Sequence, residues 1–413
     1  MSGDVLFVHN NFPAQFRDLA VALRDRGARV AAIGSPGAPG LEGVPMARWS
    51  YDRGTTPGIF PLAVRAEADL IRGHAAYRAA QALKARGFEP RMIVGHPGWG
   101  ETVLLSEVFP EARRVLFHEF FYRGRGSDID FQQEFLPANE QALLTGAAKS
   151  AVMSLALAQA DAIVTPTPFQ KSTLPPVFHP ITRVIHEGVD VAAIGSAPPA
   201  PVTLPDGLVL DGARPVITHI NRHLEPMRGL HILLRALPAL QAQVPDAQVV
   251  IVGEASARNY GGSAEDGRAW RDVILEPLAG RLDMDRVHFT GRLPHDQMLA
   301  LLRLSWAHVY YTYPFVLSWS LCEAMAAGCY VIASDTAPVR DAIDDGVNGK
   351  VLPFLDVEAL SDALVAACCA PEAYRPLRAA ARRTAAERFD RPSGRKAWLA
   401  LLDEVAGLWR TSG

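Results

Sequence analysis

Short apolar runs rich in β-branched residues alternate with amphipathic segments along most of this 413-residue chain. The alternation is typical of parallel strands joined by helices, so it predicts an α/β fold with doubly wound sheets. Between the first two predicted strands, residues 15–26 place Leu19, Ala22 and Leu23 on one helical face, and Gly27 follows as a helix stop. The predicted strands of the first half are residues 5–9, 29–33, 92–95, 114–118, 162–165 and 183–186.

A proline-rich segment, residues 197–207, interrupts this alternation. Several prolines in so short a stretch cannot lie in a helix interior or a central strand, so the segment is predicted to be a linker. The alternation then restarts, with predicted strands at 216–220, 248–253, 287–289, 309–312 and 330–333 and helices from about 231 and around 321–327. We predict an N-terminal domain over 1–195, a linker over 196–213, a second domain over 214–388 and a C-terminal helix over 389–413.

The C-terminal helix carries an apolar stripe at three- and four-residue spacing, formed by Trp398, Leu402, Val405 and Trp409. A stripe of this kind is buried in a folded protein. The pattern leaves open whether the helix crosses back to the first domain or packs on its own.

The composition is that of an ordinary globular protein, with 49% hydrophobic residues and a net charge of −3. The chain lacks the excess of basic residues that would indicate nucleic acid as a partner. The four cysteines form no C-x-x-C pair, which favours a reducing compartment and gives no metal or redox motif. The N-terminus lacks signal-peptide features, and the most apolar stretch, residues 151–164, is too short to span a bilayer. We therefore expect a cytoplasmic protein whose membrane contact, if any, is peripheral, at the inner face.

The strongest local signal is residues 311–334, where a strand, a tight loop, a helix opening near Ser318 and another strand follow in quick order. A helix N-terminus offers unpaired N–H groups and a positive dipole end, which suit a phosphate. Glu323, one turn into the helix, could accept hydrogen bonds from two sugar hydroxyls. It could equally be a first-turn glutamate that complements the dipole.

A second cluster follows the first strand of the second domain. Arg222 and Arg228 flank a turn there, and their guanidinium groups could converge on a diphosphate or remain solvated. His219 and His223 have H-x-x-x-H spacing but straddle a strand end, so we predict no metal site.

The chain resembles GT-B glycosyltransferases of the large retaining family 4, also called glycosyl transferases group 1. The resemblance covers most of the chain, and residues 95–101 and 117–122 add a likeness to polysaccharide-associated members. The matching segments are residues 160–167, 184–190, 220–222, 228–229, 248–254, 287–293, 322–328 and 345–349.

The resemblance implies a donor site in the second domain. Arg222 and Arg228 would clamp the donor diphosphate, with Arg228 standing where most members carry lysine. Glu323 would hold the ribose hydroxyls. The donor-contacting backbone would come from Gly291, Arg292 and Leu293 at the base and from Ser318, Trp319, Ser320 and Leu321 at the phosphate and sugar.

In the first domain the resemblance implies that His118 lies near the reacting carbons, and the adjacent Glu119 is an alternative that the sequence does not rank. The acceptor-side residues are expected to be Asn10, Asn11, Trp99 and Tyr122. The two asparagines replace a glycine-rich loop, and they tolerate left-handed backbone better than most residues. Trp99 and Tyr122 would form either a sugar platform or part of the core.

The implied activity is that of a metal-independent, retaining hexosyltransferase (EC 2.4) with no cofactor besides its UDP- or GDP-sugar donor. Its acceptor would be a glycan, glycolipid or small-molecule hydroxyl in bacterial polysaccharide or glycolipid synthesis. One departure is Phe315, which stands eight residues before Glu323 where the family usually has a second glutamate. An apolar ring cannot accept a hydrogen bond. A nucleotide-sugar 2-epimerase and a catalytically silent sugar-nucleotide binding protein therefore remain alternatives.

Overall fold

The computed structural model describes residues 3–257 and 260–407. The chain forms two compact units, each assembled from separate stretches. Unit 1 takes in the chain up to Ile129, Ala138–Glu187 and the chain from Pro392. Unit 2 takes in Asp130–Pro137 and Gly188–Arg391. The units are therefore interleaved along the sequence.

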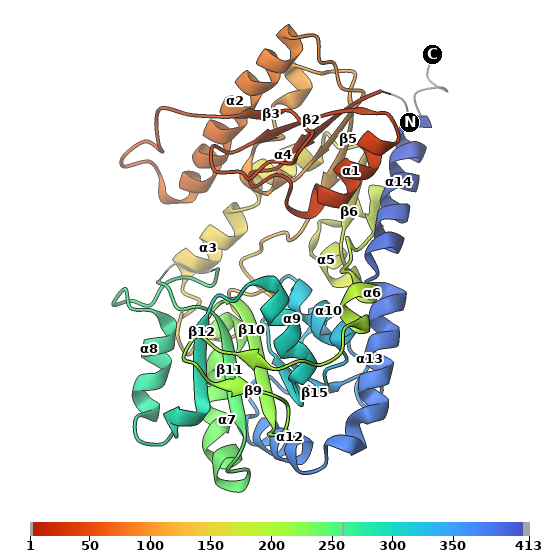
Figure 1. Cartoon of the computed structure of the whole chain (residues 1–413). Coiled ribbons are helices and arrows are strands. Elements are labelled where there is room, and N and C mark those ends of the chain that lie inside the picture. The colour runs from red at the N-terminus through yellow and green to blue at the C-terminus, as the bar shows by residue number, and fades with distance from the viewer. Residues whose placement is uncertain (1–2, 258–259, 408–413) are drawn as a thin grey trace. The chain divides into compact units, whose positions relative to one another are not determined.

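Unit 1 is built on a seven-stranded parallel sheet with the order β3-β2-β1-β4-β5-β6-β7. Figure 1 labels β2, β3, β5 and β6 of this sheet. The order runs outward from β1 in both directions, as expected for a doubly wound sheet. Its elements are β1 (Asp4–Val8), α1 (Arg17–Asp25), β2 (Arg29–Gly34), β3 (Met46–Arg48), α2 (Val64–Ala85), β4 (Met92–Gly95), β5 (Arg113–Phe117), α3 (Glu140–Ala148), α4 (Ala151–Leu157), β6 (Ala162–Thr165), α5 (Pro168–Thr173), β7 (Thr182–Val184) and α14 (Arg391–Gly407).

Alternate strand residues of unit 1 point to opposite faces of the sheet, and each face has its own helical cover. Val5 and Phe7 belong to a core cluster with α1 and α14, whereas Leu6 and Val8 belong to one with α2. α4 closes a third cluster on β5 and β6. Because both faces are buried, these strands are continuously apolar.

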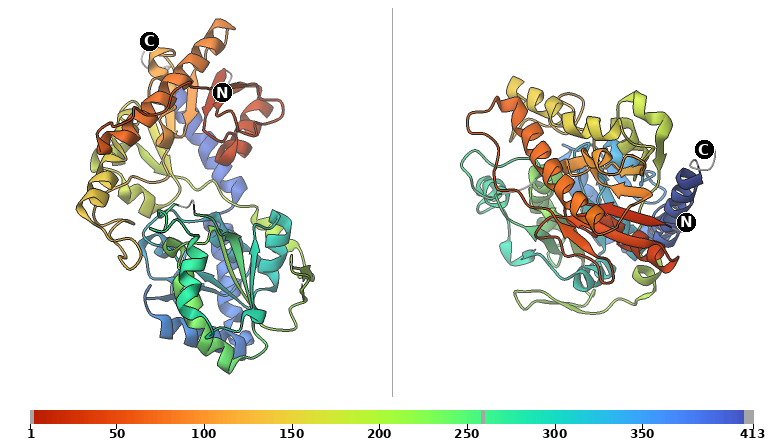
Figure 2. Two further views of the ribbon diagram at one scale, coloured as in Figure 1. Left: turned by 90° about the vertical axis from the view of Figure 1, so that its left-hand side faces the viewer. Right: turned by 90° about the horizontal axis from the view of Figure 1, so that it is seen from above.

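Helix α14 packs in the core of unit 1, where Figure 2 shows its dark blue ribbon beside the red ribbon of the N-terminal segment. The Trp398 ring lies 6.3 Å from that of Phe16 and 6.1 Å from that of Phe117. Leu402 and Val405 are also buried in this cluster. Trp409, the fourth member of the predicted stripe, lies outside the described residues.

Unit 2 is built on a six-stranded parallel sheet with the order β12-β11-β10-β13-β14-β15. Together with the sheet of unit 1, it confirms the predicted fold of two doubly wound α/β domains. Its elements are α6 (Val191–Ser196), β8 (Val202–Thr203), β9 (Val209–Leu210), β10 (Val216–His223), α7 (Leu230–Gln243), β11 (Gln248–Glu254), α8 (Trp270–Leu275), β12 (Val287–Gly291), α9 (His295–Leu304), β13 (Ala307–Tyr310), α10 (Trp319–Ala327), β14 (Val331–Ser334), α11 (Ala337–Arg340), β15 (Lys350–Leu352), α12 (Val357–Cys369) and α13 (Arg375–Arg388).

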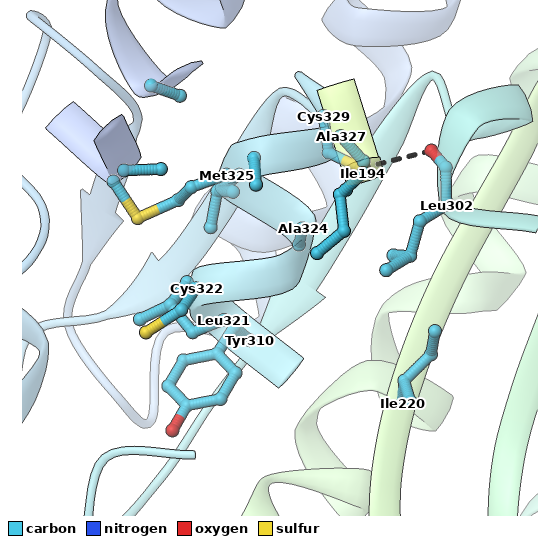
Figure 3. Close-up of a cluster of buried hydrophobic side chains, with 14 of the residues drawn as sticks. Ile194, Ile220, Leu302, Tyr310, Leu321, Cys322, Ala324, Met325, Ala327 and Cys329 are labelled. Carbon is cyan, nitrogen blue, oxygen red and sulfur yellow. Dashed lines mark hydrogen bonds between the residues drawn. The ribbon is translucent and has the colours of Figure 1, made fainter. Parts of the chain in front are cut away.

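Helix α10 is held in unit 2 by burial along almost its whole length. Figure 3 shows Leu321, Cys322 and Met325 within this cluster, with the Tyr310 ring beside the first two. The Cys329 thiol, just beyond the helix, donates to the Leu302 carbonyl oxygen at 3.1 Å. These contacts fix the position of the helix start, where a ligand site is predicted.

Two segments outside the main sheets belong to unit 2. Part of the predicted linker forms a small antiparallel sheet of β8 and β9, whose Val202 and Leu210 are buried in the main core cluster of this unit. Residues 130–137 dock on unit 2 through the Phe131 ring, 5.1 Å from that of Tyr313, and through Glu134, which pairs with Arg235. Among the described residues, no helix combines the length and the apolar character needed to cross a membrane.

Candidate functional site

Each sheet reverses its winding direction at one pair of neighbouring strands, β1 and β4 in unit 1 and β10 and β13 in unit 2. Ligands of doubly wound sheets bind beyond the carboxyl ends of the strands at this reversal. The predicted site residues lie mainly in segments that follow those strand ends or their neighbours. The candidate site therefore has two parts, one in each unit.

In unit 2, Arg228 is buried beside the loop that leads into α10. The residue is only 9% exposed, and its Nη1 donates to Thr312 Oγ1 at 2.9 Å and to the Val316 carbonyl oxygen at 3.2 Å. Gly229 allows this approach, because its φ is +72° and a Cβ there would lie 2.2 Å from Tyr311 Cβ. The fold thus holds a guanidinium group in a largely dry position at the strand reversal.

Arg222 and Arg228 share one pair of aromatic rings. Arg222 donates to Tyr260 Oη at 3.0 Å, and the centroid of the Tyr260 ring lies 6.3 Å from that of Phe315. The Arg228 guanidinium lies 5.6 Å from the centroid of the Phe315 ring, within the range of a cation–π contact. The structure therefore brings both predicted clamp residues onto a Tyr260–Phe315 pair. Tyr260 was not predicted, since it lies in a loop without a periodic pattern.

A carboxylate also neighbours Arg228. Glu225 is 1% exposed, and its Oε2 accepts a hydrogen bond from the Gly261 amide at 2.8 Å. Burial raises the pKa of the Glu225 carboxyl, while the nearby Arg228 charge works in the opposite direction. Glu225, a residue of the same unit, thus lies where it can partly balance the positive charge of Arg228.

The predicted phosphate-binding amides at the start of α10 largely have partners already. The Ser318 amide donates to Tyr310 Oη at 2.8 Å, the Ser320 amide donates to Ser318 Oγ at 3.2 Å, and the Leu321 amide donates to the Ser318 carbonyl oxygen at 3.1 Å. Trp319 exposes 43% of its surface. A phosphate at this helix start would have to share or displace these internal hydrogen bonds.

Glu323 is the fifth residue of α10, and the first turn contains no acidic residue. The alternative of a first-turn glutamate that complements the dipole is therefore wrong. The Glu323 side chain is 10% exposed, and its Oε1 lies 2.7 Å from His295 Nε2. Burial raises the pKa of the Glu323 carboxyl, and His295 lowers it. His295, the first residue of α9, was missed because nothing in the sequence pairs it with Glu323.

The segment predicted to meet the base follows β12. Gly291 ends this strand with a φ of +67°, and the exposed Arg292 pairs with Glu254. Leu293 packs against the unit 2 core. The Arg292 side chain thus has an acidic partner within unit 2.

In unit 1, three histidines directly follow neighbouring strands: His9 follows β1, His96 follows β4 and His118 follows β5. The ring centroids of His9 and His96 lie 5.3 Å apart, and Trp99 stacks on His96 at 4.3 Å. Gly100 permits the turn after Trp99, because its φ is +94° and a Cβ there would lie 2.1 Å from the Asp69 carbonyl oxygen. The strand ends of unit 1 thus carry three imidazoles, whereas β10 of unit 2 ends in Arg222 and His223, with Arg228 in the turn that follows.

Burial keeps two of these histidines neutral. It lowers the pKa of His9 to about 2 and that of His118 to about 3, and proximity to His96 contributes in both cases. His118 is fully buried, and neither of its ring nitrogens has a hydrogen-bond partner among the described residues. Glu101 is 1% exposed with both carboxylate oxygens unpaired in the described chain, and burial raises its pKa to about 7.

His118 and Glu119, which the sequence did not rank, differ in access to solvent. His118 is inaccessible, whereas the Glu119 side chain is 39% exposed and its Oε2 lies 3.4 Å from His96 Nε2. In this conformation Glu119 is the one that a ligand can reach. His96 and Glu101 belong to a segment that the sequence singled out, but their burial was not visible in any pattern.

The remaining acceptor-side predictions have mixed outcomes. Trp99 is half-buried against His9 and His96, and Tyr122 lies beneath Lys149, whose Nζ is 3.4 Å from the ring centroid. The expectation of left-handed backbone at Asn10 and Asn11 is wrong. Among the described non-glycine residues only Ala14 has a positive φ, of 40°, and it follows a cis Phe12–Pro13 peptide bond. The Asn11 amide instead donates to His9 Nδ1 at 2.8 Å.

Comparison with known families gives two matches that together cover most of the chain. Residues 26–194 match the glycosyl transferase family 4 group, and residues 205–384 match glycosyl transferases group 1. A phosphatidyl-myo-inositol mannosyltransferase of Mycolicibacterium smegmatis is 33% identical over 185 residues, which are 44% of this chain and 41% of that protein. A glycogen synthase of Mycobacterium tuberculosis is 25% identical over 244 residues, 58% of this chain and 53% of that protein. The chain thus matches about half or less of the length of these relatives.

Solved structures share the fold over nearly the whole chain. Sucrose-phosphate synthase from Thermosynechococcus elongatus superposes with a TM-score of 0.72 at 18% identity, covering 99% of this chain and 100% of that one. Anabaena HepE in complex with UDP-glucose superposes with a TM-score of 0.68 at 15% identity, covering 97% and 99%. The GT-B fold predicted from the sequence is confirmed.

Proposed function

Because the chain belongs to the family 4, group 1 glycosyltransferases, we propose that it transfers a sugar from a nucleoside-diphosphate donor to a hydroxyl acceptor. Unit 2 would bind the donor and unit 1 the acceptor. This assignment follows the charge of the two strand-end regions, since arginines suit a diphosphate and neutral buried polar groups suit hydroxyls.

The proposal rests mainly on the burial of the Arg228 guanidinium beside the loop that leads into α10. When the nucleoside diphosphate leaves, negative charge grows on its outer phosphate. A fixed cation in a largely dry position stabilises that charge more than the same cation in water would. Arg222, on the same aromatic pair, would supply the second cation, and no metal ion is needed for the step.

Relatives that act on phosphatidyl-myo-inositol and a fold relative that binds UDP-glucose favour a UDP- or GDP-sugar donor and a glycolipid or glycan acceptor. We propose retention of configuration, with the acceptor hydroxyl attacking on the face that the diphosphate leaves and the departing phosphate taking the proton. Glu323 would release His295 and accept hydrogen bonds from the ribose hydroxyls instead.

A thermal-shift panel of UDP, GDP, ADP, UDP-glucose and GDP-mannose, with and without EDTA, tests the donor site, because a ligand of the native state raises Tm. Transfer is then measured with the donor that shifts Tm, to phosphatidyl-myo-inositol in micelles and to glycogen, alongside hydrolysis of the donor. A shift that resists EDTA, together with sugar transfer or hydrolysis, supports the proposal. No shift with any nucleotide contradicts it.

A second candidate function is a sugar-nucleotide binding protein without turnover. It is favoured by Phe315, whose apolar ring contacts Arg228 and cannot hydrogen-bond a sugar hydroxyl. A selective Tm shift with neither transfer nor hydrolysis would favour this function over catalysis.

A further inference from the structure

The imidazole of His96 is held in one orientation by contacts on several sides. Its side chain is 5% exposed, and its Nδ1 accepts a hydrogen bond from the Gly98 amide at 3.1 Å. Trp99 stacks on one face, while the rings of His9 and Phe117 lie 5.3 Å and 6.0 Å away. A buried ring packed in this way has one accessible rotamer.

The Gly98 contact also determines the tautomer of His96. A nitrogen that accepts a backbone N–H carries no proton, so the proton of the neutral ring lies on Nε2. Nε2 is the atom 3.4 Å from Glu119 Oε2, and the pair is too poorly aligned to count as a hydrogen bond. Such contacts at reaction sites are often long and tighten when substrate binds.

Glu119 is fixed at its backbone and free at its carboxylate. Its carbonyl oxygen accepts from Gln170 Nε2 at 2.7 Å, and Gln170 is fully buried. Its side chain is 39% exposed, so one carboxylate oxygen can face His96 while the other faces a ligand. None of the three strand-end histidines exposes more than 5% of its side chain or residue surface.

We propose that the Glu119 carboxylate accepts a hydrogen bond from the reacting hydroxyl of the acceptor, and that His96 is the positioning residue that aims this carboxylate through its Nε2–H. The proposal rests on the proposed function and deepens it by assigning the acceptor contact. No bond forms or breaks at either residue. Glu119 orients the hydroxyl, and the departing phosphate takes its proton.

Two substitutions of His96 separate its hydrogen bond with Gly98 from its contact with Glu119. In H96N the side chain is long enough to accept from the Gly98 amide but too short to reach Glu119. In H96Q an amide N–H extends toward the Nε2 position. We expect H96N and E119Q each to lower acceptor-dependent kcat by about 10- to 100-fold, H96Q to stay within about threefold of wild type, and the H96N/E119Q double variant to be no slower than E119Q alone.

The measurements are kcat and KM for transfer with the donor that shifts Tm, and the Kd of UDP or GDP. E111Q, which removes an exposed carboxylate of unit 1, is the matched control and should behave as wild type. Nucleotide Kd should not change in any variant. Wild-type kcat in E119Q, or additive losses in the double variant, would overturn the proposal while leaving the proposed function intact. A wild-type enzyme that neither transfers nor hydrolyses would contradict the proposed function itself.

A readout independent of turnover completes the test. Long-range ¹H–¹⁵N spectra of ¹⁵N-histidine-labelled protein, with His96 assigned by its loss in H96N, report the protonated nitrogen. We expect the Nε2–H form in wild type and a changed Nε2 shift in E119Q. An Nδ1–H form, or a His96 signal that ignores E119Q, would overturn the positioning role even if the enzyme is active.

Discussion

The two strand-end regions differ in charge although the two sheets share one topology. In unit 2 the region carries guanidinium groups whose hydrogen bonds are already made, as Arg228 shows with Thr312 and Val316. In unit 1 it carries neutral imidazoles with unpaired nitrogens, as in His118. A preorganised cation suits a charged group whose position never varies, whereas neutral donors and acceptors suit hydroxyls. The same fold thus presents two different sets of chemical groups through the residues near its strand ends.

The largest expected effect concerns the charged region of unit 2 and its Arg228. We expect R228A to lower the transfer rate by on the order of 10²- to 10³-fold, because one fixed cation at the departing phosphate is lost. The measurement is kcat/KM for transfer. R281A, which removes an exposed arginine of unit 2, serves as the control. Near wild-type turnover in R228A would exclude this residue from the diphosphate clamp.

The next effect concerns the two glycines that position the two regions. G229A and G100A each place a Cβ near 2 Å from a neighbouring atom at positive φ, so we expect the free energy of unfolding to fall by roughly 2–4 kcal/mol in each. G267A and G87A have similar φ with open space around the Cβ, and they should lose only about 1 kcal/mol. Urea unfolding measures all four. Equal losses in the tight and open positions would mean that close approach is not what requires glycine.

The buried histidines of unit 1 predict that the stability of the protein depends on pH. His9 and His118 have pKa values of about 2 and 3 in the folded chain, against about 6.5 when unfolded, so each binds a proton only on unfolding below pH 6.5. Glu101, with a pKa of about 7, acts in the opposite direction because its folded form takes up the proton. Between pH 6.5 and 4.5 these three groups together lower the free energy of unfolding by about 1.4 kcal/mol per unit of falling pH.

H118N tests the contribution of His118 to this pH dependence. In the variant, the opposite effects of His9 and Glu101 on the pH slope nearly cancel. The pH slope of the free energy of unfolding should then be about 1.4 kcal/mol per pH unit smaller than in wild type, by urea titration at pH 6.5, 5.5 and 4.5. An unchanged slope would show that His118 takes up a proton in the folded state.

The smallest expected effect returns to unit 2. E323Q keeps the shape of the side chain but loses the charge, so we expect about tenfold weaker nucleotide binding, measured by calorimetry with UDP or GDP. H295A should leave that affinity equal or tighter, since it frees Glu323 from its internal partner. Weaker binding in H295A would mean that the imidazole itself contacts the nucleotide.

The central strands were predictable from sequence, as were the edge strands β7 and β12, whereas the edge strands β3 and β15 were not. Residues 92–95 and 162–165 were predicted with the observed bounds, because strands buried on both faces are continuously apolar. β3 and β15 each have only three residues, and each includes a basic residue, so neither forms a continuous apolar run. The helical pattern near the C-terminus is broken at Pro392: α13 ends at Arg388, and Pro392 lies in the first turn of α14, where no backbone hydrogen bond requires its missing N–H.

The candidate site residues also divide into those that a sequence pattern indicates and those that depend on the tertiary structure. Arg222, Arg228 and Glu323 could be proposed from the sequence because they lie in motifs with fixed spacing. His96, Tyr260 and His295 were not assigned, because their importance depends on burial or on contacts between distant segments. The tertiary structure also determines that Glu119 is accessible and His118 is not.

The position of α14 has a consequence for how the chain matures on the ribosome. Domains generally fold in order of synthesis. Here the Trp398 ring that covers Phe16 and Phe117 comes from a helix made only after the whole of unit 2. The sheet of unit 1, although synthesised first, therefore emerges with one apolar face covered only in part, by α1, and stays so until the second unit is complete. Early fragments of this protein are expected to need chaperone protection that the finished chain does not.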